Sequence, residues 1–221
     1  MPGFPRGVLF DLDGTLVDSA PDFVATIALM AARRSMPAVS LEQLRPHVSK
    51  GSRAMLKASF PSESDEDRET WVAEFLTTYE AVLGDHAPPF ELIPETLAAL
   101  DAAGVPWGIV TNKPEYLAVQ VLDKLDWSSR SQVLIGGDTL ATRKPDPLPL
   151  LVGAERMRLN PADIVYIGDD LRDIQAANAA SMRSIAALWG YRLDDEDPAD
   201  WNATVLMENV ADLLNGAKWP Q

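Results

Sequence analysis

The sequence predicts an α/β fold built on a parallel sheet, with a helical segment inserted after the first strand. Short β-rich apolar runs recur along the chain and alternate, in its second half, with helix-like stretches. Ligands of such sheets bind at the carboxyl ends of the strands, so polar residues at those ends are candidate site residues. The five expected strands are GVLFDLD (7–13), VPWGIVTN (105–112), SQVLIGG (131–137), DIVYIGDD (163–170) and RSIAALW (183–189).

The helix-like stretches divide the chain into a core and an insert. Three follow the later strands: PEYLAVQVLDKL, PLPLLVGAERM and LRDIQAANAA. Two more lie between the first and second strands: SAPDFVATIALMAARR, with Ser19 as N-cap and Pro21 in the first turn, and DEDRETWVAEFLTTYEAVLG, closed by Gly84. We therefore expect a core of residues 1–17 and 91–221 and a helical insert of residues 18–90, with the stiff HAPPFELIP segment at its exit.

Composition limits the classes of partner and metal. The chain has 221 residues, 47% hydrophobic, with a formal net charge of -14, so nucleic acid and anionic membrane surfaces are not expected partners. With no cysteine and two histidines, any divalent metal is expected on oxygen ligands. The first ten residues lack a signal-peptide core, which favours the cytoplasm, and no interface stripe is evident, so a monomer is the default expectation.

Two acidic clusters, SESDEDRE (62–69) and DDEDPAD (194–200), resemble metal sites only superficially. Carboxylates at helix starts favour the positive end of the helix dipole, and charge runs in loops are usually solvated. We interpret both clusters as solvent-facing helix starts and loops.

The first strand ends in the stretch DLDGT, which places two carboxylates together. Asp11 and Asp13 are two residues apart, so along a strand they emerge on the same side. Gly14 allows a sharp turn and a close approach to a ligand, and Thr15 offers a hydroxyl. This strand end is the first candidate for a reactive site.

Polar residues also follow the later strands. Three carboxylates beyond a very apolar strand are difficult to explain without a cation, and two of them lie at i, i+4 if the loop turns helical. These candidates are Thr111 and Asn112 in VTN, Lys144 in TRKPDP, and Asp169, Asp170 and Asp173 in IGDDLRD.

Together these residues predict phosphoryl transfer through a covalent aspartyl phosphate. Asp11 is the expected nucleophile, and Asp13 the expected general acid and base. The phosphoryl oxygens are expected to contact Lys144 and Thr111, with Asn112 beside them. A phosphate dianion among carboxylates needs a cation, and oxygen ligands without thiols favour Mg²⁺, so Mg²⁺ is the expected cofactor and a small phosphomonoester the expected substrate.

The metal ligands are expected among the same carboxylates. Asp169 is the expected direct ligand, while Asp173 binds the metal directly or through water. Asp11 and Asp13 complete the candidate metal set.

The four motifs, in this order, resemble the haloacid dehalogenase superfamily of phosphatases: DLDGT, VTN, the lysine of TRKPDP, and GDDLRD. The resemblance implies a Rossmann-like core, with Mg²⁺ bound by Asp11, the backbone carbonyl of Asp13, and Asp169. It also implies that residues 18–90 are a helical cap closing over the substrate. DLDGTLVDSAPDF and GIVTNKP are similar to the phosphoglycolate phosphatase group.

Within that group, VSKGSRAML, IGDDLRDI and GYRLDDEDPADW are similar to phosphatases of N-acetylmuramic acid 6-phosphate, which we favour as substrate over 2-phosphoglycolate. The cap loop of Lys50, Gly51, Ser52 and Arg53 matches the position from which related caps reach the substrate, although a plain helix-start loop explains it too. Asp170 departs from the frequent Ser or Thr of the group, and either alters metal affinity or orients Lys144.

Four alternatives keep part of the pattern. A dehalogenase of the same superfamily does not need an acid at Asp13, whereas a sugar phosphomutase would retain every catalytic residue. A phospho-acceptor receiver module carries its aspartate on a middle strand and has no cap. A catalytically inactive binding protein is disfavoured because no expected catalytic position is substituted.

Overall fold

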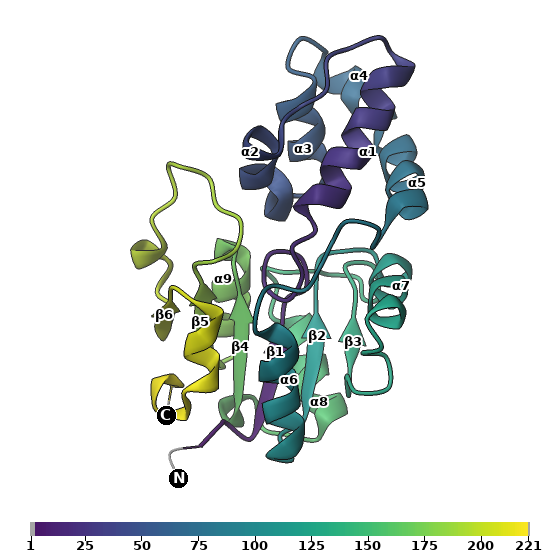
Figure 1. The fold of residues 1–221 in the computed structure, drawn as a ribbon. Coiled ribbons are helices and arrows are strands. Elements are labelled where there is room, and N and C mark those ends of the chain that lie inside the picture. Colours follow the sequence, from purple (N-terminus) through teal and green to yellow (C-terminus); the bar gives the residue numbers. More distant parts are fainter. Residues whose placement is uncertain (1–2, 221) are drawn as a thin grey trace.

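The computed structural model describes residues 3–220 and has two layers: a sheet covered by helices, and a group of helices beyond the carboxyl edge of the sheet (Figure 1). The sheet has six strands, all parallel, in the order β3-β2-β1-β4-β5-β6. This order is typical of Rossmann-like folds, so the predicted α/β class is confirmed. The strands are β1 (Gly7–Phe10), β2 (Trp107–Val110), β3 (Leu134–Ile135), β4 (Ile164–Gly168), β5 (Arg183–Ala187) and β6 (Val205–Met207).

The central strand β1 is buried on both faces. Val8 and Phe10 belong to one apolar cluster and Leu9 to another, as the twofold alternation of a strand requires. The first cluster includes Leu97 of α6, and the second includes Leu150 of α8. Helices therefore cover both faces of the sheet, which explains the continuous apolar runs of the sequence. The helices of this layer are α6 (Ile93–Ala102), α7 (Glu115–Lys124), α8 (Leu148–Met157) and α9 (Leu171–Ala179).

The second layer is formed by the helices between β1 and α6 (Figure 1). Phe23 of α1 stacks on Phe75 and Tyr79 of α5, with ring centroids 5.9 and 4.3 Å apart. Arg33 and Arg34 at the end of α1 pair with a carboxylate of α5. The layer comprises α1 (Ala20–Arg33), α2 (Leu41–Leu44), α3 (Ser52–Ser59), α4 (Asp65–Thr70) and α5 (Val72–Val82), with a 3-10 turn at Arg45–Lys50.

The two segments that join the layers run side by side. Asp18 N donates to the carbonyl of Pro88 at 2.9 Å, and Phe90 N donates to the carbonyl of Leu16 at 3.1 Å. The buried Asp22, at the start of α1, accepts hydrogen bonds from the amides of Gly84 and His86. The chain therefore leaves and re-enters the sheet layer at one place.

Two details of the helical segment differ from the sequence-based expectation. The stretch at 65–84 forms two helices, α4 and α5, instead of one. The break falls at Trp71, whose ring packs edge-on against Phe60 and beneath the guanidinium of Arg34, so tertiary contacts override helix propensity. Ser19 does occupy the N-cap of α1 but makes no side-chain capping hydrogen bond.

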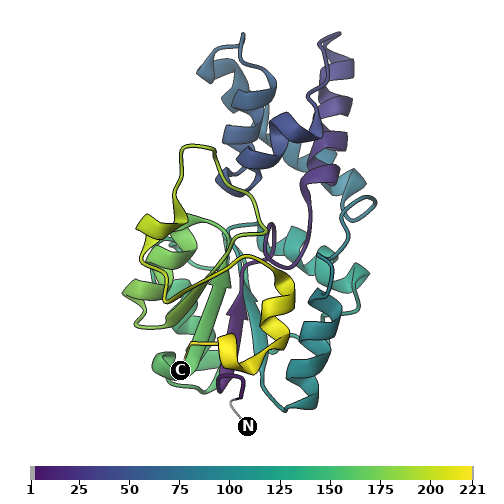
Figure 2. The ribbon, with the colours of Figure 1, turned by 60° about the vertical axis from the view of Figure 1, so that its left-hand side comes forward.

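The long connection after β5 rises toward the helical layer, as Figure 2 shows. It carries residues 188–204 to the short β6, a strand that periodicity did not indicate. Among residues 3–220, no helix combines the length and the apolar character needed to cross a bilayer.

Candidate active site

A cavity of about 320 Å³ lies between the carboxyl edge of the sheet and the helical layer. The sheet layer contributes Asp11, Asp13 and Lys144 to its walls, and the helical layer contributes Lys50 and Tyr79. In the strand order, β1 is the point at which successive connections reverse direction, and open α/β sheets bind ligands at such points. The fold therefore places the cavity where the sequence motifs end.

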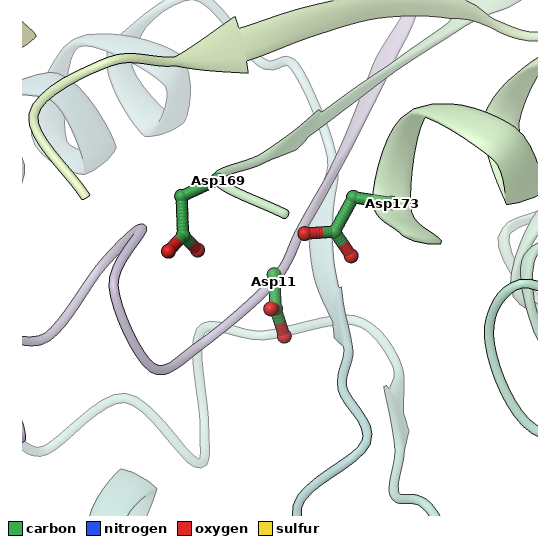
Figure 3. A group of neighbouring side chains, drawn as sticks. All are labelled: Asp11, Asp169 and Asp173. Carbon is green, nitrogen blue, oxygen red and sulfur yellow. The ribbon is translucent and has the colours of Figure 1, made fainter. Parts of the chain in front are cut away.

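Three buried carboxylates meet at one side of this cavity. Asp11 follows β1, Asp169 follows β4, and Asp173 lies in the first turn of α9 (Figure 3). One oxygen from each lies within 4.8 Å of the others. Like charges at roughly 4 Å repel by about 4 kcal/mol per pair at an effective dielectric near 20. An ionised triad of this kind needs a positive charge among its members.

Burial and neighbouring carboxylates raise the pKa values of Asp169 and Asp173. Burial, together with the Asp11 and Asp173 carboxylates, raises the pKa of Asp169 well above its usual value. Burial also raises the pKa of Asp173 to about 6, while the Lys144 ammonium acts in the opposite direction. The cluster thus favours either protons or a cation.

Asp169 is fixed in place by several donors. Its carboxylate accepts hydrogen bonds from Thr15 Oγ1 at 3.0 Å, Ser49 Oγ at 2.7 Å and the amide of Tyr191 at 2.9 Å. Gly14 adopts φ +84°, and a Cβ there would lie 2.2 Å from Asp169 Oδ2. Glycine is therefore required at this position both by the backbone conformation and by the close approach of Asp169.

The i, i+4 spacing of Asp169 and Asp173 applies only if both residues lie in one helix, but α9 begins at Leu171. Asp170 is its N-cap and accepts a hydrogen bond from the amide of Arg172 at 3.0 Å, while Asp173 accepts one from the amide of Asp170 at 3.0 Å. Asp169 lies outside the helix and reaches the triad from the end of β4. The N-cap geometry at Asp170, rather than the i, i+4 spacing of a helix, brings Asp169 and Asp173 together.

Lys144 is the positive group nearest the triad. Its ammonium lies 3.0 Å from Asp11 Oδ1, 2.6 Å from Asp173 Oδ1 and 2.7 Å from the hydroxyl of Tyr166. Burial acts to lower the pKa of Lys144, but Asp11 and Asp173 outweigh it and raise the pKa above its usual value. Lys144 is therefore a fixed cation held by Asp11 and Asp173. Asp170 pairs with Lys50 and Arg172 instead, so it reaches Lys144 only through Asp173, which accepts a hydrogen bond from the amide of Asp170.

Asp13 is engaged by a lysine that the sequence analysis did not select. Both carboxylate oxygens of Asp13 lie 3.1 Å from Lys113 Nζ, which also donates to the hydroxyl of Tyr79 at 2.5 Å. The same ammonium lies over the rings of Phe23 and Tyr79, 5.2 and 4.4 Å from their centroids. A core lysine thus joins Asp13 to the helical layer.

Thr111 and Asn112 line the cavity at the end of β2. Thr111 is buried, and its hydroxyl accepts a hydrogen bond from the amide of Lys113 at 3.2 Å. The side-chain Nδ2 of Asn112 donates to the backbone carbonyl of Lys144 at 3.0 Å. Within residues 3–220, the buried Oδ1 of Asn112 has no hydrogen-bond partner. Both residues therefore line the same cavity as Lys144, and Asn112 contacts Lys144 directly.

The cap loop also lines the cavity, but its cations are already paired. Lys50 Nζ lies 2.7 Å from Asp170 and 2.5 Å from Glu196, and Arg53 pairs with Glu69 at 2.5 Å. The remaining loop residues, Gly51 with φ +90° and Ser52 at the first position of α3, also face the cavity. Contact between this loop and the substrate stays a prediction.

Asp170 is kept ionised by Arg172 and Lys50. Burial acts to raise its pKa, but hydrogen bonds and charge from Arg172 and Lys50 hold the pKa below its usual value. Glu196 belongs to the acidic cluster that we interpreted as a solvated loop, and for this residue the interpretation is wrong: the loop folds onto the helical layer and pairs with Lys50.

Sequence reasoning missed several site residues. Lys113 directly follows the VTN motif, so its position at a strand end was an available signal. Tyr166 is the polar member of an otherwise apolar strand, and its hydroxyl also donates to the carbonyl of Val110 at 2.8 Å. Ser49 and Glu196 gave no local signal, because their contacts depend on how distant segments pack.

The residues present fit a divalent metal. The donors of the triad are all carboxylate oxygens, the chain has no cysteine, and hard divalent cations prefer oxygen ligands. The arrangement thus combines a carboxylate triad that could hold a divalent metal, a fixed lysine and a second carboxylate at Asp13.

Comparison with known proteins places this site in a family. The sequence profile described as "Haloacid dehalogenase-like hydrolase" matches residues 8–187. A phosphoglycolate phosphatase of Xanthomonas campestris pv. campestris is 57% identical over 218 residues, covering 99% of each chain. An N-acetylmuramic acid 6-phosphate phosphatase of Pseudomonas aeruginosa is 39% identical over 211 residues, covering 95% of this chain and 93% of its own.

The fold agrees with these relatives. The crystal structure of a "predicted phosphoglycolate phosphatase" from Haemophilus somnus superimposes with a TM-score of 0.84 at 24% identity, covering 97% of each chain. The chain belongs to the haloacid dehalogenase-like hydrolases, and it is a phosphatase of that family. Phosphatases of this family use a divalent metal, which agrees with the carboxylate triad.

We predict that Mg²⁺ stabilises the protein more at about pH 8 than at about pH 5. The raised pKa values of Asp169 and Asp173 mean that the ionised triad destabilises the metal-free fold, and protonation relieves this as the pH falls. Protons therefore compete with the metal only at the lower pH. Differential scanning fluorimetry with Mg²⁺ or EDTA measures the increase in Tm at each pH.

The variant Asp169→Asn is the control, and it should lose most of the increase at about pH 8. An equal increase in Tm at both pH values would contradict the assignment of the triad as the metal site.

Proposed function

We propose that the chain is a Mg²⁺-dependent phosphatase that hydrolyses 2-phosphoglycolate through a phosphorylated Asp11. The observation that carries this proposal is the meeting of Asp11, Asp169 and Asp173, with Lys144 paired to Asp11 and Asp173, because it joins a nucleophile to the charges that a phosphoryl group requires. The 57% identity to a phosphoglycolate phosphatase supports the choice of substrate.

Asp11 is the proposed nucleophile. Its Oδ1 accepts a hydrogen bond from the amide of Leu12 at 2.8 Å and pairs with Lys144, so Oδ2 remains to attack phosphorus. Attack forms the bond from Oδ2 to phosphorus and breaks the bond from phosphorus to the ester oxygen. Water then attacks phosphorus, releasing phosphate and restoring the Asp11 carboxylate.

Asp13 is the proposed general acid and base. It gives its proton to the departing ester oxygen and later takes a proton from the attacking water. Its carboxylate now pairs with Lys113, so it must leave that contact to reach the substrate. The pair with Lys113 and Tyr79 thus gives Asp13 a resting position at the edge of the cavity.

The phosphoryl oxygens would be held by Lys144, Thr111 and Asn112. Lys144 supplies a fixed charge, Thr111 lines the cavity, and the side-chain amide of Asn112 donates to the backbone carbonyl of Lys144. Asp11, Asp169 and the backbone carbonyl of Asp13 would bind Mg²⁺, with Asp173 contributing directly or through water. Bound there, Mg²⁺ would offset the negative charge of the phosphoryl group.

The proposed substrate, 2-phosphoglycolate, differs from the substrate that the sequence motifs favoured. The motifs suggested N-acetylmuramic acid 6-phosphate, but the relative with that name is 39% identical, against 57% for the phosphoglycolate phosphatase. The cavity of about 320 Å³ is large for a two-carbon acid, and this observation keeps the amino-sugar phosphate as the second candidate.

A panel of phosphate esters tests the substrate. We expect kcat/KM for 2-phosphoglycolate to exceed that for N-acetylmuramic acid 6-phosphate, glucose 6-phosphate and AMP by about a hundredfold. Phosphate release is measured with Mg²⁺, and Asp11→Asn serves as the blank for contaminating activity. A reversed preference would assign the amino-sugar phosphate, and a flat profile would contradict both candidates.

We also propose that residues 18–90 form a cap that closes over the core of residues 1–17 and 91–221. The two joining segments run together, which suits a hinge, and polar contacts cross between the layers. Ser49 contacts Asp169, Arg172 donates to the carbonyl of Ser49, and Lys50 joins Asp170 to Glu196. Lys50 therefore ties the cap both to α9 and to the connection after β5.

The variant Glu196→Gln tests this cap. Removing one of the two carboxylates around Lys50 should raise amide hydrogen exchange in residues 45–59 and 188–197 by about three- to tenfold, with exchange in β1 and β4 unchanged. Within residues 3–220, the exposed Glu155 of α8 makes no ion pair or side-chain hydrogen bond, so Glu155→Gln is the matched control. A rise in amide exchange spread evenly over both layers would contradict the division of the chain into a cap and a core.

A further inference from the structure

Most of the basic side chains that line the cavity are already paired with carboxylates. Among the residues that the structure describes, six basic side chains line the cavity, and five of them are paired with carboxylates. The paired five are Lys50, Arg53, Lys113, Lys144 and Arg172. Their charges are largely offset before any substrate enters.

Arg143 is the exception. It lines the cavity, is exposed, and within residues 3–220 its side chain makes no hydrogen bond or ion pair. It lies in the connection between β3 and α8, directly before Lys144. An exposed arginine on a convex surface is normally solvated, but this one lies at the wall of a cavity that contains four carboxylates.

A substrate that carries a carboxylate besides its phosphoryl group needs such a cation. Its second negative charge would meet Asp11, Asp13, Asp170 and Asp173, each of which repels it. In the proposed function Mg²⁺ would offset the charge of the phosphoryl group, and Lys144 is already paired with Asp11 and Asp173. The planar guanidinium of an unpaired arginine binds a carboxylate through two parallel hydrogen bonds, which a paired lysine does not offer.

We propose that Arg143 binds the carboxylate of the substrate and is a specificity-determining residue, an inference that rests on the proposed hydrolysis of 2-phosphoglycolate. Arg143 directly precedes Lys144, both residues line the same cavity, and Lys144 Nζ lies 3.0 Å from the nucleophile Asp11. In 2-phosphoglycolate a single methylene separates the ester oxygen from the carboxylate. With its phosphoryl group at Asp11, the carboxylate of this substrate would therefore lie inside the cavity that Arg143 lines.

The cap loop is less suited to this role. Lys50 is shared between Asp170 and Glu196, and releasing it would break both ion pairs and leave Asp170 with Arg172 alone. Arg53 pairs with Glu69 by two hydrogen bonds at the protein surface, where their side chains are 63% and 55% exposed. Arg143 needs to break no contact in order to bind.

Paired substrates test the inference in the holoenzyme with Mg²⁺. The first is 2-phosphoglycolate, and the second is 2-hydroxyethyl phosphate, which has the same two carbons and a hydroxyl in place of the carboxylate. We compare the wild type, Arg143→Met and Arg143→Lys. The control is Arg156→Met, because Arg156 is exposed on α8, lies outside the cavity lining, and makes no ion pair with any residue of the described range 3–220.

Arg143→Met should lower kcat/KM for 2-phosphoglycolate at least about tenfold, mainly through KM, and change that for 2-hydroxyethyl phosphate by less than about twofold. Arg143→Lys should restore part of the loss, and Arg156→Met should change neither. Equal losses on both esters, or no loss on 2-phosphoglycolate, would overturn the role of Arg143.

The wild type tests the proposed function separately. If it fails to prefer 2-phosphoglycolate over 2-hydroxyethyl phosphate and prefers an amino-sugar phosphate, the substrate assignment fails and the inference falls with it. If the wild type shows the preference and Arg143→Met retains it, only the inference fails.

Discussion

The structure depends on holding three buried carboxylates against their mutual repulsion. Asp11, Asp169 and Asp173 come from two strand ends and one helix start, and each pair repels by about 4 kcal/mol at roughly 4 Å and an effective dielectric near 20. Lys144 offsets part of this charge, and a divalent cation is needed for the rest. The same concentration of charge that makes the metal-free site unfavourable makes it selective for a cation and a phosphoryl group.

The surroundings of the triad keep its members from separating. Gly14 permits the close approach of Asp169, the N-cap of α9 turns Asp173 inward, and the hydroxyl of Tyr166 fixes Lys144 from the floor of the sheet. Contacts from the helical layer reach the same groups: Ser49 donates to Asp169, and Tyr79 shares Lys113 with Asp13. A change in the position of the helical layer would therefore be felt directly at the reactive carboxylates.

Local patterns predicted the sheet and most of the site because both follow from short stretches of sequence. Strand ends and their polar residues predicted where Asp11, Lys144 and Asp169 lie, since parallel strands share one carboxyl edge. The pairing of Lys50 with Glu196 depends on a long connection folding onto another layer, and no periodicity encodes that. Likewise, the helix break at Trp71 arises from ring contacts with Phe60, which propensity does not include.

The most direct test of the account is to trap the covalent enzyme. The protein is mixed with 2-phosphoglycolate and Mg²⁺, quenched in acid during turnover, and analysed by peptide mass spectrometry. The account predicts one added phosphoryl group on Asp11, absent from Asp11→Asn, which should also lack turnover. Turnover by Asp11→Asn at a rate near that of the wild type, or a phosphoryl group on another residue, would contradict it.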